Sequence, residues 1–134
     1  MEATSFPVPV SLISAAERRW AVGIHLGVLL LALLTSWAAG LAGAIGAGGA
    51  LLLRPLNSDF VAEHAKEALN FNLSMFIYLI IGVLFSVFTL GLGLLVVVPM
   101  AIVLAIAWLV CSIQASIAAS DGLAYRYPFT LRLF

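Results

Sequence analysis

The sequence predicts an all-α membrane protein, a polytopic bundle with three full spans and a short or re-entrant, glycine-rich second segment. Three observations predict this class. The 134 residues are 64% hydrophobic and 9% charged, whereas soluble domains are about 45–50% apolar and about 25% charged. The apolar residues form runs long enough to cross a bilayer. The few charges gather between or beyond these runs, as expected where lipid is the solvent.

The chain divides into a mobile tail, residues 1–16, and a single transmembrane domain, residues 17–134. Arg18 and Arg19 precede the first apolar run, which is also the outline of a secretory signal peptide. The run continues well beyond the small residues that end at Gly40. We therefore expect an uncleaved first span.

The first apolar run extends from Trp20 to Leu53, 34 residues without a charge. As one straight helix it would be about 51 Å long, against a hydrocarbon core of about 30 Å. The polar and small residues Thr35–Gly40 predict a break. The part after it, Leu41–Leu53, contains four glycines and either crosses as a short span or re-enters.

Two further spans are expected in the second half. A helix begins near Phe60, after N-capping residues that include Ser58, and crosses the bilayer over Phe71–Leu90. Glycines from Gly91 mark a tight turn, and Leu94–Ala119 forms the last span. Pro99 lies in its first turns, where proline costs least.

The positive charges predict the topology. If the first apolar run crosses twice or re-enters, every basic residue lies on one side of the bilayer, and the positive-inside rule makes that side cytoplasmic. We expect a multi-pass protein of the cell membrane with both termini in the cytoplasm. The basic residues are Arg18, Arg19, Arg54, Lys66, Arg126 and Arg132.

Polar residues spaced by three or four form a stripe on the charged helix. They are Glu63, Glu67, Asn70, Ser74 and Tyr78. This polar stripe either forms a groove wall or contact face for a polar partner, or bonds to neighbouring helices. Tyr125 and Tyr127, on either side of Arg126, are expected to be anchors at the membrane surface. The predicted interaction face consists of Glu63, His64, Lys66, Glu67, Asn70, Tyr125 and Arg126.

Reactive chemistry is not expected. His64 and Glu67 share a helix face, but only His25 could join them, so no metal site is predicted. We expect His64 at the interface near Asp59 or Glu67, and His25 as a buried hydrogen-bonding residue. Cys111 is the single cysteine and is interpreted as a packing residue. No nucleophile or phosphate-binding motif occurs, so neither an enzyme nor a cofactor is predicted.

Small residues recur every four positions in two segments, which lets helices approach closely. The packing of helices within one bundle or between identical copies explains both sets. One set is Ala39, Gly43 and Ala47, and the other is Ala107, Cys111, Ala115 and Ala119.

Three motifs resemble a known family. They are Trp20-Ala21 followed by His25, the segment Glu63–Phe71, and the segment Tyr125–Arg132. Together they are similar to a bacterial membrane family of unknown function, grouped with the twenty-kilodalton membrane subunit of the chloroplast inner-envelope protein-import translocon (Tic). The resemblance covers roughly residues 17–134. The chain departs from the pattern in lacking a proline shortly before Arg54 and a lysine shortly before Asp121.

The resemblance implies a role near protein translocation. We accordingly expect a structural or accessory membrane component that contacts the lipid bilayer and other membrane proteins or a second copy of itself. The alternative is an oligomeric channel or small-solute transporter. The balanced charge, six basic and six acidic residues, predicts no nucleic-acid partner.

Overall fold

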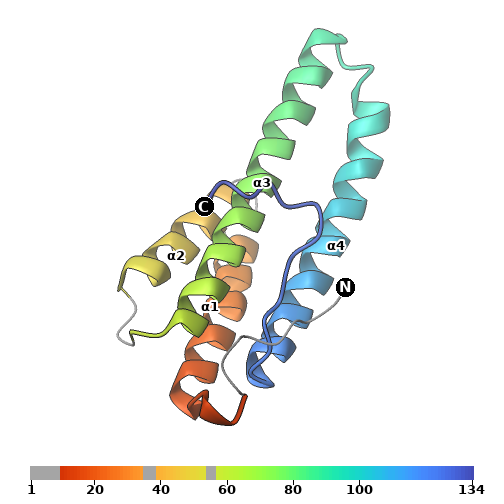
Figure 1. The fold of residues 1–134 in the computed structure, drawn as a ribbon. Helices are drawn as coiled ribbons and strands as arrows, with labels where there is room; N and C mark the ends of the chain where they lie inside the picture. The colour runs from red at the N-terminus through yellow and green to blue at the C-terminus, as the bar shows by residue number, and fades with distance from the viewer. Residues whose placement is uncertain (1–9, 35–38, 54–56) are drawn as a thin grey trace.

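A computed structural model describes residues 10–34, 39–53 and 57–134. Four α-helices follow a short 3-10 turn at Val10–Leu12. The helices are α1 (Ala15–Leu34), α2 (Ala39–Leu53), α3 (Asp59–Phe88) and α4 (Leu94–Ser120). They form two helical hairpins, α1–α2 and α3–α4, that pack side by side (Figure 1). The predicted all-α class with four helical segments is confirmed.

The start of α1 is fixed by a capping box. The Ser14 N–H donates to Glu17 Oε2 at 2.7 Å, and the Glu17 N–H donates to Ser14 Oγ at 3.2 Å. The Arg18 guanidinium reaches back to the Val10 carbonyl at 2.8 Å. Ile13, just before the helix, is buried in the core. The remainder of the predicted tail, residues 1–9, lies outside the described residues.

The predicted break in the first apolar run separates α1 from α2, although residues 35–38 themselves lie outside the described residues. The glycines of α2 then allow close packing on α3. A Cβ at Gly40 would lie 2.7 Å from the backbone nitrogen of Phe76, and a Cβ at Gly43 would overlap the Asn72 side chain. Gly43 and the fully buried Ala47, two members of the first set of small residues, therefore serve packing within the bundle.

Local chemistry also fixes the ends of α3 and α4. Ser58 Oγ accepts from the Val61 N–H at the start of α3, as expected for an N-cap. The α4 helix ends in a Schellman motif: Gly122 has φ +74°, and the Leu123 N–H donates to the Ala118 carbonyl at 2.9 Å. Arg54 and Pro55 lie outside the described residues.

The two hairpins differ in length. The start of α2 lies opposite Phe76, as the Gly40 contact shows. Beyond this level α3 continues for 12 residues to Phe88, which is about 18 Å of helix. Figure 1 shows α3 and α4 extending well past the α1–α2 hairpin. The polar half of the molecule therefore has four helices and the other half has two.

Two helices, α3 and α4, are long and apolar enough to cross a membrane. The prediction of three full spans is not confirmed. Glu17, Arg18 and Arg19 lie in the first turns of α1 and leave only Trp20–Leu34 uncharged. These 15 residues rise about 22 Å, short of a hydrocarbon core of about 30 Å.

The core is built mainly from small residues. One cluster joins α1, α2 and the first half of α3 through alanines such as Ala21, Ala47 and Ala65. A second cluster joins α3, α4 and the C-terminal segment (residues 123–134) around Phe71 and Ala115. Small side chains allow the close helix approach that takes the place of a hydrophobic driving force in lipid.

Candidate functional site

The C-terminal segment lies along α3 and covers most of the polar stripe (Figure 1). Four of the five stripe residues bond its backbone, and these four are Glu67, Asn70, Ser74 and Tyr78. The partners of each pair are more than 50 positions apart in the sequence. Of the two predicted alternatives, neither a groove for a partner nor bonds to neighbouring helices describes these four contacts, because their partner is the non-helical C-terminal segment.

Asn70 is fully buried and holds the end of the chain. Its Nδ2 donates to the Phe134 carbonyl at 3.0 Å. Its Oδ1 accepts from the N–H groups of Leu133 and Phe134, both at 3.1 Å. One amide therefore bonds three backbone groups at the end of the C-terminal segment.

The next two stripe residues continue this pattern. Ser74 Oγ accepts from the Leu131 N–H at 2.8 Å and donates to the Asn70 carbonyl at 2.6 Å. The Tyr78 hydroxyl donates to the Phe129 carbonyl at 2.6 Å. Phe129 has φ +56°, so the C-terminal segment turns sharply at this point. Asn70, Ser74 and Tyr78 therefore bond backbone groups of the segment rather than its side chains.

Glu67 is the charged member of this contact. Its Oε2 accepts from the Tyr127 N–H at 3.2 Å. Its Oε1 lies 3.6 Å from Nε of Arg132, and the Glu67 side chain is 13% exposed. This half-buried ion pair links the C-terminal segment to α3 by charge as well as by hydrogen bonds.

Two histidines and a tyrosine form a buried chain of hydrogen bonds. His25 Nε2 lies 2.7 Å from His64 Nδ1, His64 Nε2 lies 3.1 Å from the Leu123 carbonyl, and the Tyr127 hydroxyl lies 2.9 Å from His25 Nδ1. A carbonyl only accepts, so His64 Nε2 carries the hydrogen. In a neutral pair of rings, His25 Nε2 then donates to His64, and Tyr127 donates to His25. Every donor in the chain has an acceptor.

The two tyrosines of the C-terminal segment complete this cluster. The Tyr127 ring stacks on Phe71, with centroids 4.1 Å apart and an interplanar angle of 15°. The Tyr125 hydroxyl donates to Gln114 Oε1 at 3.0 Å. Burial raises the pKa of both phenols above the ordinary tyrosine value. Both side chains are thus neutral interior groups.

Several predictions about individual residues are wrong. His64 was expected at the interface near Asp59 or Glu67, but it is 1% exposed and bonded to His25. Tyr125 and Tyr127 were expected as surface anchors, but both are buried. The expectation of a buried, hydrogen-bonded His25 agrees with the structure.

The predicted interaction face divides into two sets. Glu63 and Lys66 form an exposed ion pair at 3.3 Å, and Arg126 is exposed near the same end of the bundle. The other members are the half-buried Glu67 and the buried His64, Asn70 and Tyr125, which contact other parts of this chain. The exposed set can meet a partner directly, and the face as a whole stays a prediction.

The sequence did not predict that Tyr127 bonds His25 or that Tyr125 bonds Gln114. The signal that could have indicated these bonds was the presence of two histidines in largely apolar helices together with two tyrosines in the C-terminal segment. Within the described residues, no group of three or more His, Cys, Asp or Glu side chains could hold a metal ion. Cys111 is buried and forms no disulfide.

Fold and site together define a small all-α membrane protein whose internal polar groups secure its own C-terminal segment. The model of the Magnetosome magnetite crystal formation protein family (MamF/MmsF) matches residues 16–134. The chain belongs to this family. No curated protein and no solved structure matches it.

This finding corrects the resemblance to the chloroplast import translocon, which was wrong. The link to protein translocation depended on that resemblance and loses its basis. The motifs that carried it have a structural explanation, because His25, Asn70, Phe71 and Tyr127 are the residues that join α1, α3 and the C-terminal segment. They specify how this bundle closes.

Proposed function

We propose that this protein is a non-enzymatic membrane component that takes part in magnetite crystal formation. Membership in the magnetosome family supports a role in magnetite crystal formation. The observation that carries the non-catalytic role is how certain internal polar side chains are used. Those of His25, His64, Asn70, Ser74 and Tyr127 join α1, α3 and the C-terminal segment by hydrogen bonds. Such a network stabilises a bundle in lipid and presents no nucleophile beside a free base.

We propose that α3 and α4 cross the membrane and that α1–α2 re-enters from the charged side. The length difference of the two hairpins supports this placement, because α1–α2 ends about 18 Å short of the end of α3. The basic residues of the described helices lie at one end of the bundle. The positive-inside rule makes that end cytoplasmic.

The working surface in this proposal is the charged end of the bundle, with the exposed side chains of Glu63, Lys66 and Arg126. A polar partner in the same membrane, or a second copy of this chain, would bind there. The apolar extension of α3 and α4 would hold this surface at a fixed height above the bilayer.

The test is replacement of the gene in a magnetite-forming bacterium. Deletion is expected to change the size or number of crystals seen by electron microscopy, and the unaltered gene should restore them. A triple variant, Glu63→Gln, Lys66→Gln and Arg126→Gln, should reach the membrane yet fail to restore the crystals. Normal crystals in the deletion strain would refute the proposed process.

A flux assay separates this role from the alternative of a channel or small-solute transporter. The protein reconstituted in liposomes is expected to pass ions and small solutes no faster than protein-free vesicles. The reason is that the described core is filled mainly by alanines and aromatic side chains, and only Asn72 Oδ1 and Trp108 Nε1 are buried side-chain polar atoms without a partner among the described residues. Flux that is lost in Asn70→Ala, with helicity retained, would favour a transporter.

A further inference from the structure

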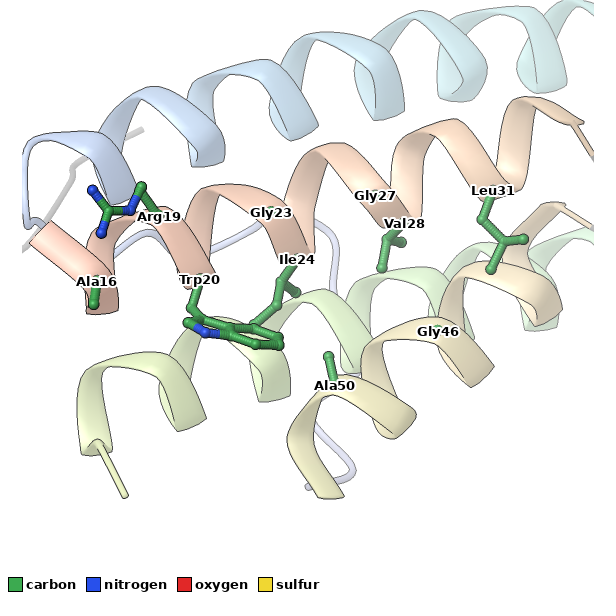
Figure 2. Close-up of a pocket in the computed structure, with 10 residues that line it drawn as sticks. All are labelled: Ala16, Arg19, Trp20, Gly23, Ile24, Gly27, Val28, Leu31, Gly46 and Ala50. Carbon is green, nitrogen blue, oxygen red and sulfur yellow. The ribbon is translucent and has the colours of Figure 1, made fainter. Parts of the chain in front are cut away.

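An apolar groove runs along the outer face of the α1–α2 hairpin (Figure 2). Its volume is about 470 Å³. It begins near Arg19, at the charged end of the bundle, and reaches Leu31 near the end of α1. These positions are 12 residues apart, or about 18 Å of helix, slightly more than the half-thickness of a 30 Å hydrocarbon core.

The groove is open where α1 carries two glycines. A Cβ at Gly23 or at Gly27 would meet no atom within 4 Å. Neither glycine therefore serves close packing inside this chain, unlike Gly40 and Gly43 of α2. A glycine inside a helix costs about 1 kcal/mol relative to alanine. The two glycines leave the floor of this groove open to an occupant outside the chain.

The walls of the groove are apolar along its length. Figure 2 shows the Trp20 ring lying along the groove next to Ile24, with Gly46 and Ala50 of α2 on the other side. Trp20 is 40% exposed. Tryptophan at the boundary between charge and apolar surface is typical of the level where lipid headgroups meet acyl chains.

Arg19 gives the groove a charged mouth. Arg18, its neighbour, uses its guanidinium on the carbonyls of Val10 and Ile13, and Arg132 pairs with Glu67. Arg19 is exposed, and no carboxylate among the described residues lies within ion-pair distance of it. A guanidinium at this position matches a phosphate, which it binds with two parallel hydrogen bonds.

We propose that the groove binds an anionic phospholipid, with its phosphate on Arg19 and one acyl chain across Gly23 and Gly27. The inference rests on the proposed membrane placement and is independent of the role in crystal formation. Two glycines four apart also suit a contact with a second copy. That contact would bring Arg18 and Arg19 of parallel helices together as like charges, which favours the lipid.

The test uses Trp20 as a reporter. In a parent protein with Trp37→Phe and Trp108→Phe, Trp20 is the remaining tryptophan. The parent is placed in phosphatidylcholine vesicles that contain a minor fraction of acyl-brominated phosphatidylglycerol or of acyl-brominated phosphatidylcholine. Bromine quenches a tryptophan that it contacts. Quenching should report about fivefold enrichment of the anionic lipid, the effect of one arginine near a charged headgroup.

Matched variants locate the effect. Arg19→Gln should reduce quenching by phosphatidylglycerol to the phosphatidylcholine level, whereas Arg126→Gln should leave the preference intact. Gly27→Leu fills the groove and should lower quenching by both lipids. Gly49→Leu, at an equally open position that does not line the groove, should not. Circular dichroism confirms helicity, and Gly23→Leu replaces Gly27→Leu if that variant unfolds.

Three results would overturn the proposal. Equal quenching by the two lipids in the parent would exclude selective binding. An equal loss in Arg19→Gln and Arg126→Gln would show only general surface charge. The third result combines quenching with chemical crosslinking in the same vesicles. If the parent forms a crosslinked dimer that Gly27→Leu loses, while quenching is unchanged, the groove binds a second copy of this chain. None of these measurements involves magnetite crystals. A negative result would therefore refute lipid binding in the groove without refuting the proposed role in crystal formation.

Discussion

The two halves of the molecule are stabilised in different ways. In the four-helix half, polar groups such as His25, Asn70 and Ser74 are buried and bonded. In the two-helix half, residues 77–88 of α3 and the first turns of α4 expose large apolar side chains, including Phe88 at 82% and Leu95 at 78%. Lipid solvates the exposed apolar side chains of the two-helix half without cost. The buried polar groups of the four-helix half instead need hydrogen-bond partners within the protein.

The difference teaches where substitutions should matter. A side chain in the four-helix half is fixed by specific contacts, so its replacement leaves a clash or an unpaired group. A side chain in the two-helix half mostly faces lipid, so another apolar residue serves equally well. Close contacts between α3 and α4 in that half, such as Gly82 against Val97, are the exception.

The largest effect is expected for Gly43→Leu. A Cβ at this position would overlap Asn72, so α2 would have to move away from α3. We expect a loss of about 3 kcal/mol, at the upper end for an overpacked core, measured as unfolding in mixed detergent micelles. Gly49→Leu, in the same helix but without a neighbour within 4 Å, is the control. Equal destabilisation by both would contradict the tight α2–α3 packing.

Asn70→Ala should destabilise the protein by about 2 kcal/mol, because the N–H groups of Leu133 and Phe134 lose their acceptor. The same change should release the end of the C-terminal segment, and carboxypeptidase digestion measures this directly. Asn57→Ala, at an exposed position before α3, should leave both readouts unchanged. A segment that stays protected in Asn70→Ala would show that other contacts suffice.

Tyr127→Phe should cost about 1 kcal/mol at neutral pH, the typical net value of one hydrogen bond. The variant keeps the ring stacked on Phe71 and removes the hydroxyl that bonds His25 Nδ1. The measurement is the same unfolding transition. A Tyr127→Leu variant distinguishes the contribution of the ring from that of the hydroxyl. Its free energy of unfolding should fall further than that of Tyr127→Phe, because it also loses the stacking on Phe71.

The tyrosines also predict a response to alkali. Burial raises the pKa of Tyr125 and Tyr127 in the folded state, so the native protein holds their protons more tightly than the unfolded chain does. Their contribution is fully present below about pH 10, the ordinary tyrosine pKa, and is lost as the pH rises above it. The Tyr125→Phe and Tyr127→Phe double variant should lose less stability between pH 9 and 11, pH values chosen to bracket the ordinary pKa.

The smallest effect is expected in the two-helix half. Leu95→Ala should change the free energy of unfolding in micelles by less than about 0.5 kcal/mol, because Leu95 is 78% exposed. Leu95→Asn would introduce a polar group facing lipid and should reduce insertion into the membrane. A large loss from Leu95→Ala would mean that this face packs against another protein, and the contrast between the halves would not hold.

The sequence predicts the features set by local chemistry. The Ser58 cap, the end of α4 at Ser120 and the break after Leu34 all lie close to their expected positions. Helical periodicity also identified the polar stripe. These features depend on residues a few positions apart, which a single sequence displays directly.

The features that the sequence did not predict depend on contacts between distant segments. Periodicity shows that Asn70 and Ser74 share a face, but not that residues 57 to 64 positions later lie on it. The partners of His25, His64 and Tyr127 come from three different elements. The third predicted full span is not confirmed, because the absence of charge between Trp20 and Leu53 does not show how far each helix reaches.

The short α1–α2 hairpin has a consequence for the shape of the membrane. In the proposed placement, four helices fill the cytoplasmic leaflet and two fill the opposite one. The protein is then a wedge that takes up more area on one side of the bilayer. A membrane rich in this chain would relieve the imbalance by bending, with the two-helix side on the concave surface. The start of α2 opposite Phe76, which keeps the α1–α2 hairpin short, would thereby favour small, closed compartments.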